Sequence, residues 1–445
     1  MENEKRYHSV RLDKSRCRGC TNCLKRCPTE AIRVHSGRAH IMDERCIDCG
    51  ECIRICTYHA KLAVTDGLEA LKEFRYTVAL PAPSLYGQFR HVKSADHVLS
   101  ALKMAGFDDV FEVARGADLV SRALHDKLRE PGLPKPLISS ACPAVVRLIQ
   151  VRFPDLLPHV VNIRQPMEVA ADMARREVCQ RENCAPEEVG VFMITPCPAK
   201  MTAIRSPLGQ RTSSVSGAIS MLDLYGLLRP FVHKGQQLSG CRARATSYGL
   251  AWAASNGEAS AVCPENSLAV DGIHNCLQVL EEIENNKLND LVFFEGSACV
   301  GGCVGGPLTV ENNYVAKNTI RRLTDESRAR QDDHPAHSVP VSLMGRYALF
   351  NDAPFLPNDA LRLDDDIEEA MRKMEQMNRL VERLPGYDCG SCGAPTCRCF
   401  AEDIVRGYRK ELECVHLLRG RLKEMAQDMV ELARDGLNEP KEAQK

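Results

Sequence analysis

The sequence contains no apolar run of the roughly 18 residues that a membrane-spanning helix requires. Its first residues, Met-Glu-Asn-Glu-Lys-Arg-Tyr-His, have no apolar signal core. We therefore expect a cytoplasmic protein without membrane insertion. Charge of one sign is not in excess either, because 58 Lys and Arg stand against 59 Asp and Glu. Without a basic surface field, nucleic-acid binding is not expected.

Aromatic residues are scarce, at 5% of the chain with a single tryptophan, and the 13 histidines show no paired metal spacing. Cysteine is abundant instead, with 22 in 445 residues. In a long chain without a signal peptide, we interpret these thiols as metal ligands in a reducing, anaerobic environment rather than as disulfides. A hydrophobic content of 44% is enough for a large core and more than one domain.

Residues 1–66 carry the pattern Cys-x2-Cys-x2-Cys-x3-Cys twice, which is an internal duplication. Three closely spaced thiolates bind three corners of a [4Fe–4S] cubane, and the fourth cysteine of each run reaches the other cluster. The two expected ligand sets are Cys17, Cys20, Cys23 and Cys56, and Cys46, Cys49, Cys52 and Cys27. The segment resembles bacterial two-cluster ferredoxins. A pair of zinc knuckles is the alternative, which the lack of an interleaved histidine disfavours.

Residues 70–350 alternate apolar runs with amphipathic helices, which predicts an α/β domain of parallel or mixed sheets flanked by helices. Buried strands are expected at Tyr76–Leu80, Leu137–Ser140, Val189–Thr195 and Leu291–Glu295. The last three lead into cysteine loops, which contain Cys142, Cys197, and Cys299 with Cys303. Because ligands collect at the carboxyl ends of parallel strands, we expect these four cysteines to share one site.

Two further features of these loops suit an anionic metal centre. Glycines let the backbone near Cys303 approach a ligand closely; they are Gly301, Gly302, Gly305 and Gly306. Lys200 places an ammonium three residues after Cys197. Each feature also has a plainer interpretation. A Cys-Pro after a strand is usually a buried small hydrophobe, and a glycine-rich stretch is usually only a turn; no Gly-Lys-Ser/Thr supports a phosphate loop.

The three loops resemble the signature loops of [FeFe] hydrogenases over about 280 residues, in addition to the N-terminal part. The resemblance implies that Cys142, Cys197 and Cys299 are terminal ligands of a cubane. Cys303 would bridge this cubane to a diiron unit with CO, cyanide and a dithiolate, the two together forming the H-cluster. Lys200 matches the lysine that hydrogen-bonds a cyanide, and maturation proteins would be required partners.

The chain also departs from that family. Ala141 stands where the first loop usually has a proton-relay cysteine, and proton transfer needs donors and acceptors within about 3 Å or one water apart. Other expected relay and loop positions are changed as well: the glutamates fall near Leu124 and Lys127, the serine near Val161, a methionine at Thr195 and a glutamate at Ala203. We expect slow turnover, which resembles the divergent, sensory branch of the family.

Residues 363–445 are expected to form a small helical iron–sulfur domain. A helix is predicted from Asp364 to Arg383, after a polar, mobile stretch at Thr324–His337. The spacing Cys-x2-Cys-x4-Cys-x16-Cys suits another [4Fe–4S] cluster, with a helix from Ala401 to Leu412 before the fourth ligand. The expected ligands are Cys389, Cys392, Cys397 and Cys414. This resembles the cluster domain found in the B components of membrane redox complexes and in the sensory branch; zinc is the alternative.

An apolar stripe follows Cys414 in steps of three and four residues, which is an a/d pattern of about two and a half heptads. Its members are Val415, Leu418, Leu422, Met425, Met429 and Leu432. The stripe predicts either a homodimer or signalling contact, or a helix that packs on the protein's own core. The surplus cysteines lack ligand spacing and are interpreted as core or surface thiols: Cys179, Cys184, Cys241, Cys263, Cys276 and Cys399. His59 is interpreted as a surface residue.

Three functions compete. The favoured one is a regulatory hydrogenase that binds or slowly converts H2 and passes electrons through [4Fe–4S] clusters to a redox or signalling partner, such as a kinase, a phosphatase or a ferredoxin. The second is a catalytic, ferredoxin-linked hydrogenase, against which Ala141 counts. The third is a non-enzymatic iron–sulfur electron-transfer or cluster-assembly protein, against which Lys200 and the two-cluster front count.

Overall fold

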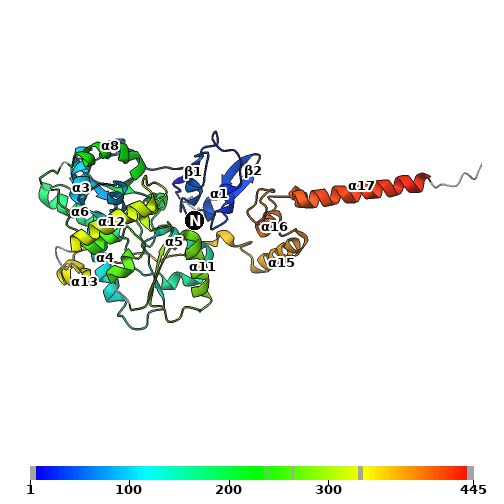
Figure 1. Ribbon diagram of the computed structural model, residues 1–445. Helices are drawn as coiled ribbons and strands as arrows, with labels where there is room; N and C mark the ends of the chain where they lie inside the picture. Colours follow the sequence, from blue (N-terminus) through cyan, green and yellow to red (C-terminus); the bar gives the residue numbers. More distant parts are fainter. Residues whose placement is uncertain (1–6, 236, 240, 263–264, 329–333, 438–445) are drawn as a thin grey trace, which may run out of the picture.

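The computed structural model describes residues 7–235, 237–239, 241–262, 265–328 and 334–437. Figure 1 shows an α/β body, an N-terminal cysteine-rich region beside it, and a helical C-terminal region from which one long helix, α17, projects. Among the described residues, no helix is both long and apolar enough to cross a membrane. The domain boundaries at 1–66, 70–350 and 363–445 stay a prediction.

The N-terminal region is ferredoxin-like, with two strand pairs and two short helices. β1 pairs antiparallel with β4, and β2 pairs antiparallel with β3. The elements are β1 (Val10–Leu12), α1 (Asn22–Lys25), β2 (Ile32–His35), β3 (Arg38–Ile41), α2 (Glu51–Arg54) and β4 (Lys61–Ala63). Each cysteine run leads into one of the short helices, so the sequence duplication has a structural counterpart.

The body contains two sheets, and every pairing in them is parallel. One sheet has the order β6-β5-β8-β9, and its strands are β5 (Tyr76–Pro81), β6 (Asp109–Val110), β8 (Val189–Thr195) and β9 (Gly217–Ser220). The other has the order β10-β11-β7, with β7 (Leu137–Ile138), β10 (Ser267–Asp271) and β11 (Phe293–Ser297). The predicted α/β class with parallel sheets is confirmed.

Three predicted strands differ in extent from those observed, and the first, predicted at Tyr76–Leu80, is longer by one residue. The strand predicted at Leu137–Ser140 has two residues; beyond it, the Ser140 hydroxyl donates to the Ile163 carbonyl at 2.8 Å. The strand predicted from Leu291 begins at Phe293. The Leu291 N–H closes a turn onto the Leu288 carbonyl instead of joining the sheet.

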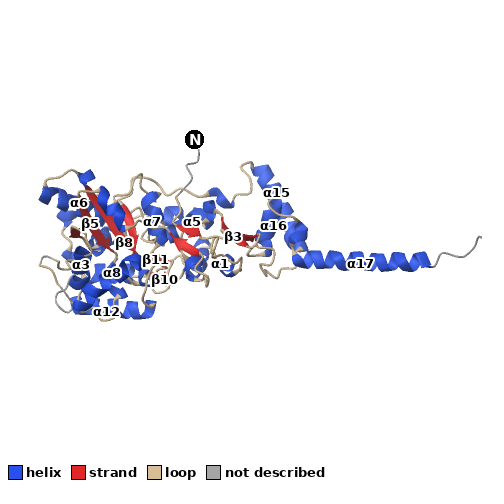
Figure 2. Cartoon of the chain, turned by 90° about the horizontal axis from the view of Figure 1, so that it is seen from above, coloured by secondary structure: helices blue, strands red, loops and turns tan. Residues whose placement is uncertain are grey.

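Helices cover both sheets, and several begin with proline at the first position, where its missing N–H costs nothing. The helices of the body are α3 (Ala95–Met104), α4 (Val113–Lys127), α5 (Pro143–Arg152), α6 (Pro166–Glu182), α7 (Pro198–Arg205), α8 (Met221–Lys234), α9 (Ser247–Ala251), α10 (Gly257–Val262), α11 (Ile273–Glu284), α12 (Asn313–Arg328), α13 (Pro335–Ser338) and α14 (Val341–Met344). Figure 2 shows α3, α6, α8 and α12 around the strands β5 and β8.

The polar stretch expected at Thr324–His337 is not one loop. Its first residues complete α12, whose apolar positions Ala316, Ile320 and Leu323 recur at helical spacing and are buried. Pro335 to Ser338 form α13. The remaining part, residues 329–333, lies outside the described residues, so the expected mobility stays untested.

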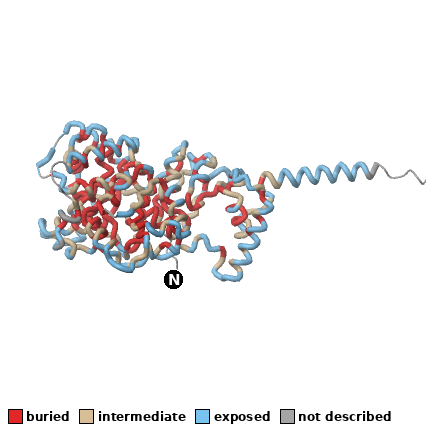
Figure 3. The backbone as a smooth tube through the Cα atoms, turned by 60° about the horizontal axis from the view of Figure 1, so that its bottom comes forward, coloured by how far each residue is buried: buried red, intermediate tan, exposed pale blue. Residues whose placement is uncertain are grey.

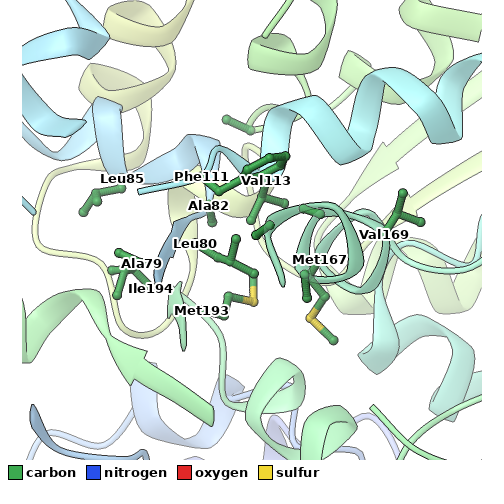
Figure 4. Packing of buried hydrophobic residues seen from close by; sticks show 14 of the residues in the cluster. Ala79, Leu80, Ala82, Leu85, Phe111, Val113, Met167, Val169, Met193 and Ile194 are labelled. Atoms are coloured by element: carbon green, nitrogen blue, oxygen red, sulfur yellow. The ribbon is translucent and has the colours of Figure 1, made fainter. Parts of the chain in front are cut away.

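The main hydrophobic core surrounds β5 and β8. Leu80 and Met193 are register partners on these strands and lie side by side in Figure 4. Both are at most 3% exposed. Figure 3 shows buried residues throughout the body and exposed residues along α17. The core therefore fixes the positions of the strand ends that carry the cysteine loops.

The C-terminal region is helical, with α15 (Ile367–Arg383), α16 (Cys397–Val405) and α17 (Val415–Leu437). The predicted helix from Asp364 is confirmed within a few residues, since Asp366 caps it by accepting from the Glu369 N–H. The helix predicted at Ala401–Leu412 is wrong in its bounds. Thr396 caps α16 earlier, and Gly407, at φ 78°, lies in the left-handed region that ends a helix.

Candidate metal centre and its neighbouring cysteine clusters

The three central cysteine loops meet at one cavity. Cys142 and Cys197 are the N-cap residues of α5 and α7, while Cys299 and Cys303 follow β11. All four line a cavity of about 100 Å³. Since β8 belongs to one sheet and β7 and β11 to the other, the thiols converge only where the two sheets come together. The predicted grouping in space is observed, and the ligand roles stay a prediction.

Burial makes this group of thiols unfavourable as free thiolates. Desolvation raises the pKa of Cys299 to about 11 and that of Cys303 to about 12, and the neighbouring thiols add to both shifts. Desolvation and the same neighbours hold the pKa of Cys197 well above its ordinary value. Cationic iron would compensate the charge of these thiolates, so the donor set fits a cluster of soft metal ions.

The backbone at Gly302 explains why the Cys303 loop requires glycine. Gly302 has φ 90°, and a Cβ added there would lie 2.4 Å from the Ser255 backbone N. The next residue, Cys303, begins a 3-10 turn, Cys303–Gly305, and has accessible surface that lines the cavity. The loop therefore presents a thiol to the cavity with its backbone packed tightly behind.

Lys200 lies at the cavity and is held in position by two acceptors. Its Nζ donates to the Ala141 carbonyl and to Gln165 Oε1, both at 2.8 Å. Gln165 is the N-cap residue of α6 and is 6% exposed. The arrangement fixes an ammonium beside the four thiols, where it favours an anionic occupant.

Two buried carboxylates, Glu258 and Glu295, also line the cavity, and the sequence interpretation missed them. Glu258 Oε2 accepts a hydrogen bond from Ser139 Oγ at 2.6 Å, and Glu295 accepts from the N–H groups of Asn256 and Ala259 at 2.8 Å. Desolvation raises the pKa of Glu258 to about 8 and that of Glu295 to about 7; the charge of Glu295 adds to the first shift. These groups can hold a proton near neutral pH.

Most positions at which the chain is expected to depart from the family pattern have apolar side chains, which cannot relay a proton. Ala141 lines the cavity with a methyl group, while Leu124, Val161 and Ala203 are buried hydrophobic residues. Thr195 directs its hydroxyl to the Cys197 loop, where it accepts from the Cys197 N–H at 3.1 Å. The placement of these residues against the family pattern stays a prediction.

The N-terminal cysteines form two groups with the expected exchange of the fourth member. The pKa of Cys23 is raised by burial and by the thiols of Cys20, Cys56 and Cys17. Burial likewise raises the pKa of Cys52 to about 12, with Cys27 as one contributing neighbour. Cys46 and Cys49 interact with Cys52 and Cys27 in the same way. The thiols are thus brought together as predicted, and their roles as ligands of two clusters stay a prediction.

In each half of the N-terminal region, a backbone N–H group donates to the fourth cysteine of the run. Cys27 Sγ accepts from the Ala31 N–H at 3.2 Å, and Cys56 Sγ accepts from the Ala60 N–H at 3.3 Å. Each donor lies four residues after its cysteine. Hydrogen bonds to sulfur influence the potential of an iron–sulfur cluster, so the duplication extends to the polar environment of the two sites.

The four predicted C-terminal cysteines also line a common pocket, together with residues such as Phe400 and His416. Cys397 begins α16, and Cys414 follows the 3-10 turn Glu411–Glu413. His416 Nε2, at the start of α17, lies 3.7 Å from Cys389 Sγ. The pattern Cys389, Cys392, Cys397 and Cys414 is thus brought together, as the sequence predicts.

Contacts connect the three cysteine-rich sites in series. Cys49 lines the central cavity, and Arg54 Nη2 in the neighbouring helix α2 donates to the Gly305 carbonyl at 2.6 Å. On the other side of the N-terminal region, Gly390 packs against α1: a Cβ added there would be 3.4 Å from the side chains of Lys25 and Thr21. The N-terminal region therefore lies between the cavity and the C-terminal pocket.

The C-terminal region is joined to the N-terminal region by buried ion pairs. Arg33 Nε and Nη2 donate to the Asp403 carboxylate at 2.7 and 3.0 Å, and Arg45 forms a two-point contact with Glu402. Arg33 is 8% exposed and Asp403 is 3% exposed. The Val34 N–H also donates to the Gly393 carbonyl at 2.8 Å. Such bidentate pairs fix orientation as well as distance.

The surplus cysteines have no common site. Cys241 and Cys276 are buried in the two cores of the body, and Cys179 lies beside Cys184 at the end of α6. Cys399 is buried in the C-terminal region, next to Glu30 of the N-terminal region. Cys263 lies outside the described residues. His59 is exposed, as expected for a surface residue.

Family models match three parts of the chain. The model described as iron only hydrogenase large subunit, C-terminal domain, matches residues 75–263 and 255–307, which is more than half of the chain. The chain belongs to the iron-only, or [FeFe], hydrogenase family. Residues 9–57 match a 4Fe-4S dicluster domain, and residues 384–416 match a putative Fe-S cluster domain. The two flanking matches coincide with the cysteine groups described above.

Similar proteins agree with this assignment. The chain is 28% identical over 214 residues to the periplasmic [Fe] hydrogenase large subunit of Nitratidesulfovibrio vulgaris, covering 44% of this chain and 51% of that protein. It is 22% identical to iron hydrogenase 1 of Clostridium pasteurianum, over 74% of this chain and 70% of that protein. The first match thus spans about half the length of the relative.

One further relative is of a different kind. The chain is 48% identical over 44 residues to the B component of the ion-translocating oxidoreductase complex of Methanosarcina acetivorans, which is 10% of this chain and 17% of that protein.

Proposed function

We propose that this protein is a sensory or regulatory [FeFe] hydrogenase that binds or slowly converts H2 (H2 = 2 H+ + 2 e-) and passes electrons to a protein partner. The observation that carries the proposal is the cavity that combines four converging thiols with Lys200 and with Ala141 in place of a relay cysteine. The thiols and Lys200 support hydrogen chemistry, and Ala141 supports a low rate of turnover.

The residues around the cavity fit an H-cluster by their chemistry. Cys142, Cys197 and Cys299 would hold its cubane and Cys303 would bridge to its diiron unit, which supplies the site for H2 when bound. Lys200 donates hydrogen bonds and so orients an anionic ligand, while Met167 and Met193 keep the cavity apolar. Glu258 can take up a proton on its carboxylate, whose Oε2 accepts a hydrogen bond from Ser139 Oγ. Dedicated maturation proteins are the implied partners for building the diiron unit.

The order of contacts supports a route for electrons. Cys49 lines the cavity, so the first cluster on the electron route would be the one held by Cys46, Cys49, Cys52 and Cys27. The set of Cys17, Cys20, Cys23 and Cys56 follows, and the C-terminal set adjoins it through Gly390 and α1. A redox or signalling partner would then receive electrons at the C-terminal region, with three [4Fe–4S] clusters between it and the H-cluster.

The catalytic alternative is favoured by one observation, the buried pair of Glu258 and Glu295. Their raised pKa values, about 8 and about 7, allow proton exchange near neutral pH even without a relay cysteine. The non-enzymatic alternative, an iron–sulfur or cluster-assembly protein, gives no reason for an ammonium and two carboxylates at the same cavity.

Infrared spectroscopy of the anaerobically purified, maturase-treated protein tests the proposal. CO and cyanide bands that shift on addition of H2 are expected, together with H2 uptake well below that of a matured catalytic hydrogenase assayed in parallel. Cys303→Ala is the matched control, because it removes the expected bridge and should abolish the bands. Absence of bands after competent maturation would leave the non-enzymatic alternative, and a rate equal to the catalytic enzyme would overturn the sensory one.

A further inference from the structure

We propose that α17 pairs with α17 of a second copy of this chain in antiparallel orientation, through the stripe of Val415, Leu418, Leu422, Met425, Met429 and Leu432. The inference does not rest on the proposed function, because it concerns a helix beyond every predicted cluster ligand. It identifies the partner of the stripe as the same stripe in a second molecule.

Beyond Val415, which lines the C-terminal cysteine pocket, the stripe is exposed. From Leu418 onward its side chains are 40%, 56%, 51%, 69% and 72% exposed. Leu417 packs partly against the C-terminal core, which holds the base of the helix only. Figures 1 and 3 show the rest of α17 projecting away from the body. The alternative that this helix packs on the protein's own core is therefore wrong.

Single exposed apolar residues are ordinary, but a continuous stripe of them at heptad spacing marks an interaction surface. An isolated helix is also marginal in water, since most helical stability in proteins comes from packing of the apolar face. A second helix against the stripe would remove these side chains from water and stabilise α17 at the same time.

An antiparallel pair matches the stripe with itself over its whole length. If Leu422 faces Met425 of the second copy, Leu418 faces Met429 and Val415 faces Leu432. Each match occurs twice by symmetry, so every residue of the stripe has an apolar partner. Leucine and methionine alternate across these layers, and a flexible methionine fills the space that a neighbouring leucine leaves.

Charges beside the stripe favour the same orientation. Arg421 and Asp428 occupy equivalent heptad positions, one residue before Leu422 and Met429. In the antiparallel register these positions face each other, so Arg421 of each copy meets Asp428 of the other. In a parallel pair they would meet Ala426 and Ala433, with no charge partner. Arg421 now contacts Glu424 at 3.2 Å, an exposed pair that can rearrange at little cost.

The shape of the molecule also disfavours a parallel pair. In Figures 1 and 2 the remainder of the chain lies behind the first turn of α17, roughly in line with the helix. Packed helix axes are only about 8–10 Å apart, so a parallel pair would bring both bodies into the same space. An antiparallel pair places the bodies at opposite ends of the two helices.

Charge reversal with rescue tests this arrangement on the full-length protein. We expect size-exclusion chromatography with light scattering to give a dimer that dissociates on dilution. Arg421→Asp and Asp428→Arg should each weaken dimerisation by roughly tenfold, and the double variant should restore it, because the pair is merely exchanged between copies. Arg434→Asp, an exposed charge on the opposite side of the helix, is the matched control and should have no effect.

Each other outcome counts against the proposal. A wild-type protein that stays monomeric at every concentration would overturn it and leave the stripe for a different protein. A dimer that ignores both single reversals would overturn the antiparallel orientation. A dimer that persists after deletion of residues 415–445 would place the interface elsewhere. The charge variants lie outside the cysteine sites, so a loss of dimer in them cannot be attributed to a lost cluster ligand.

Discussion

At the scale of single residues, Ala141 has an apolar side chain but lies next to polar groups of the cavity. Its methyl group cannot relay a proton, but its backbone N–H donates to Ser139 Oγ at 3.1 Å, and that hydroxyl donates to Glu258 at 2.6 Å. A chain of hydrogen bonds thus begins directly behind the substituted position. The cavity therefore has a proton-holding group although Ala141 itself is apolar.

Glu258→Gln is expected to lower the rate of H2 oxidation by about 100-fold, because an amide cannot accept the proton. The pKa of Glu258 is raised to about 8 by burial and then by Glu295. The carboxyl is therefore mostly protonated below this pH, and the wild-type rate should rise as pH increases through about 8. The variant should lose this rise, which a pH profile of dye-coupled H2 uptake measures.

Unchanged infrared bands in Glu258→Gln would show that the site itself is intact. Ser139→Ala provides a comparison, since it removes the hydroxyl that donates to Glu258 and leaves the carboxylate titratable. A wild-type pH profile in the glutamine variant would exclude Glu258 from proton transfer.

Lys61 is the second residue with a specific expectation. It is 2% exposed, its Nζ has no hydrogen-bond partner among the described residues, and its charge acts on both Cys23 and Cys52. A buried ammonium between two anionic clusters favours their reduction. Lys61→Met should therefore lower both reduction potentials, by roughly 60 mV for each 1.4 kcal/mol of lost interaction.

A redox titration followed by electron paramagnetic resonance measures this shift. Lys14→Met, on the exposed N-terminal surface, is the control and should leave the potentials unchanged. Equal potentials in Lys61→Met and the wild type would contradict the role given to this ammonium.

Sequence and structure agree best for the residues with regular spacing. The N-terminal and C-terminal cysteine groups follow from spacing alone, whereas the central group was predicted from the strands that its loops follow. Glu258 gave no such signal, since nothing nearby in sequence marks it. Glu295 did give one: a carboxylate inside the apolar run Leu291–Glu295 has to be buried when the strand is buried.

At the scale of secondary-structure elements, α16 is the contact between two regions distant in sequence. Arg33→Met would leave Asp403 as an uncompensated buried charge, which costs about 3–5 kcal/mol. We expect faster hydrogen–deuterium exchange in residues 384–416, because α16 would detach more often from β2. Arg372→Met is the control, since its pair with Glu369 is exposed and contributes little.

Slow exchange in both variants would mean that the ion pair does not hold α16 in place.

The ends of α16 also show where prediction by pattern fails. The apolar spacing continued past Gly407 in sequence, but Thr396 and Gly407 set the ends through local backbone geometry. Side-chain periodicity carries no information about either capping interaction.

At the scale of the whole molecule, the three cysteine-rich sites lie in series, which the sequence did not reveal. Spacing identifies a ligand set, whereas the order of sets depends on contacts such as those of Cys49 with the cavity and Gly390 with α1. The strand patterns predicted that the cysteine loops share one site, but not that their strands belong to two separate sheets, since each sheet forms by long-range pairing.

Cys392→Ala tests the position of the C-terminal site in this series. The variant should lose one [4Fe–4S] signal in electron paramagnetic resonance, together with the magnetic broadening that this cluster imposes on its neighbour. The infrared bands should stay unchanged, because the cavity lies beyond the N-terminal region. Cys241→Ala, which changes a buried thiol outside the predicted ligand sets, is the control. Unbroadened signals in the wild type would place the C-terminal cluster outside the route.

Gly393 gives this series a single point of vulnerability. A Cβ at this position would lie 1.8 Å from the Val34 carbonyl oxygen, on a glycine that already has φ 85°. The methyl group of a Gly393→Ala variant would therefore push the C-terminal region away from the N-terminal region. This change would interrupt the proposed electron route without altering a predicted metal ligand, a charge or a residue of the central cavity.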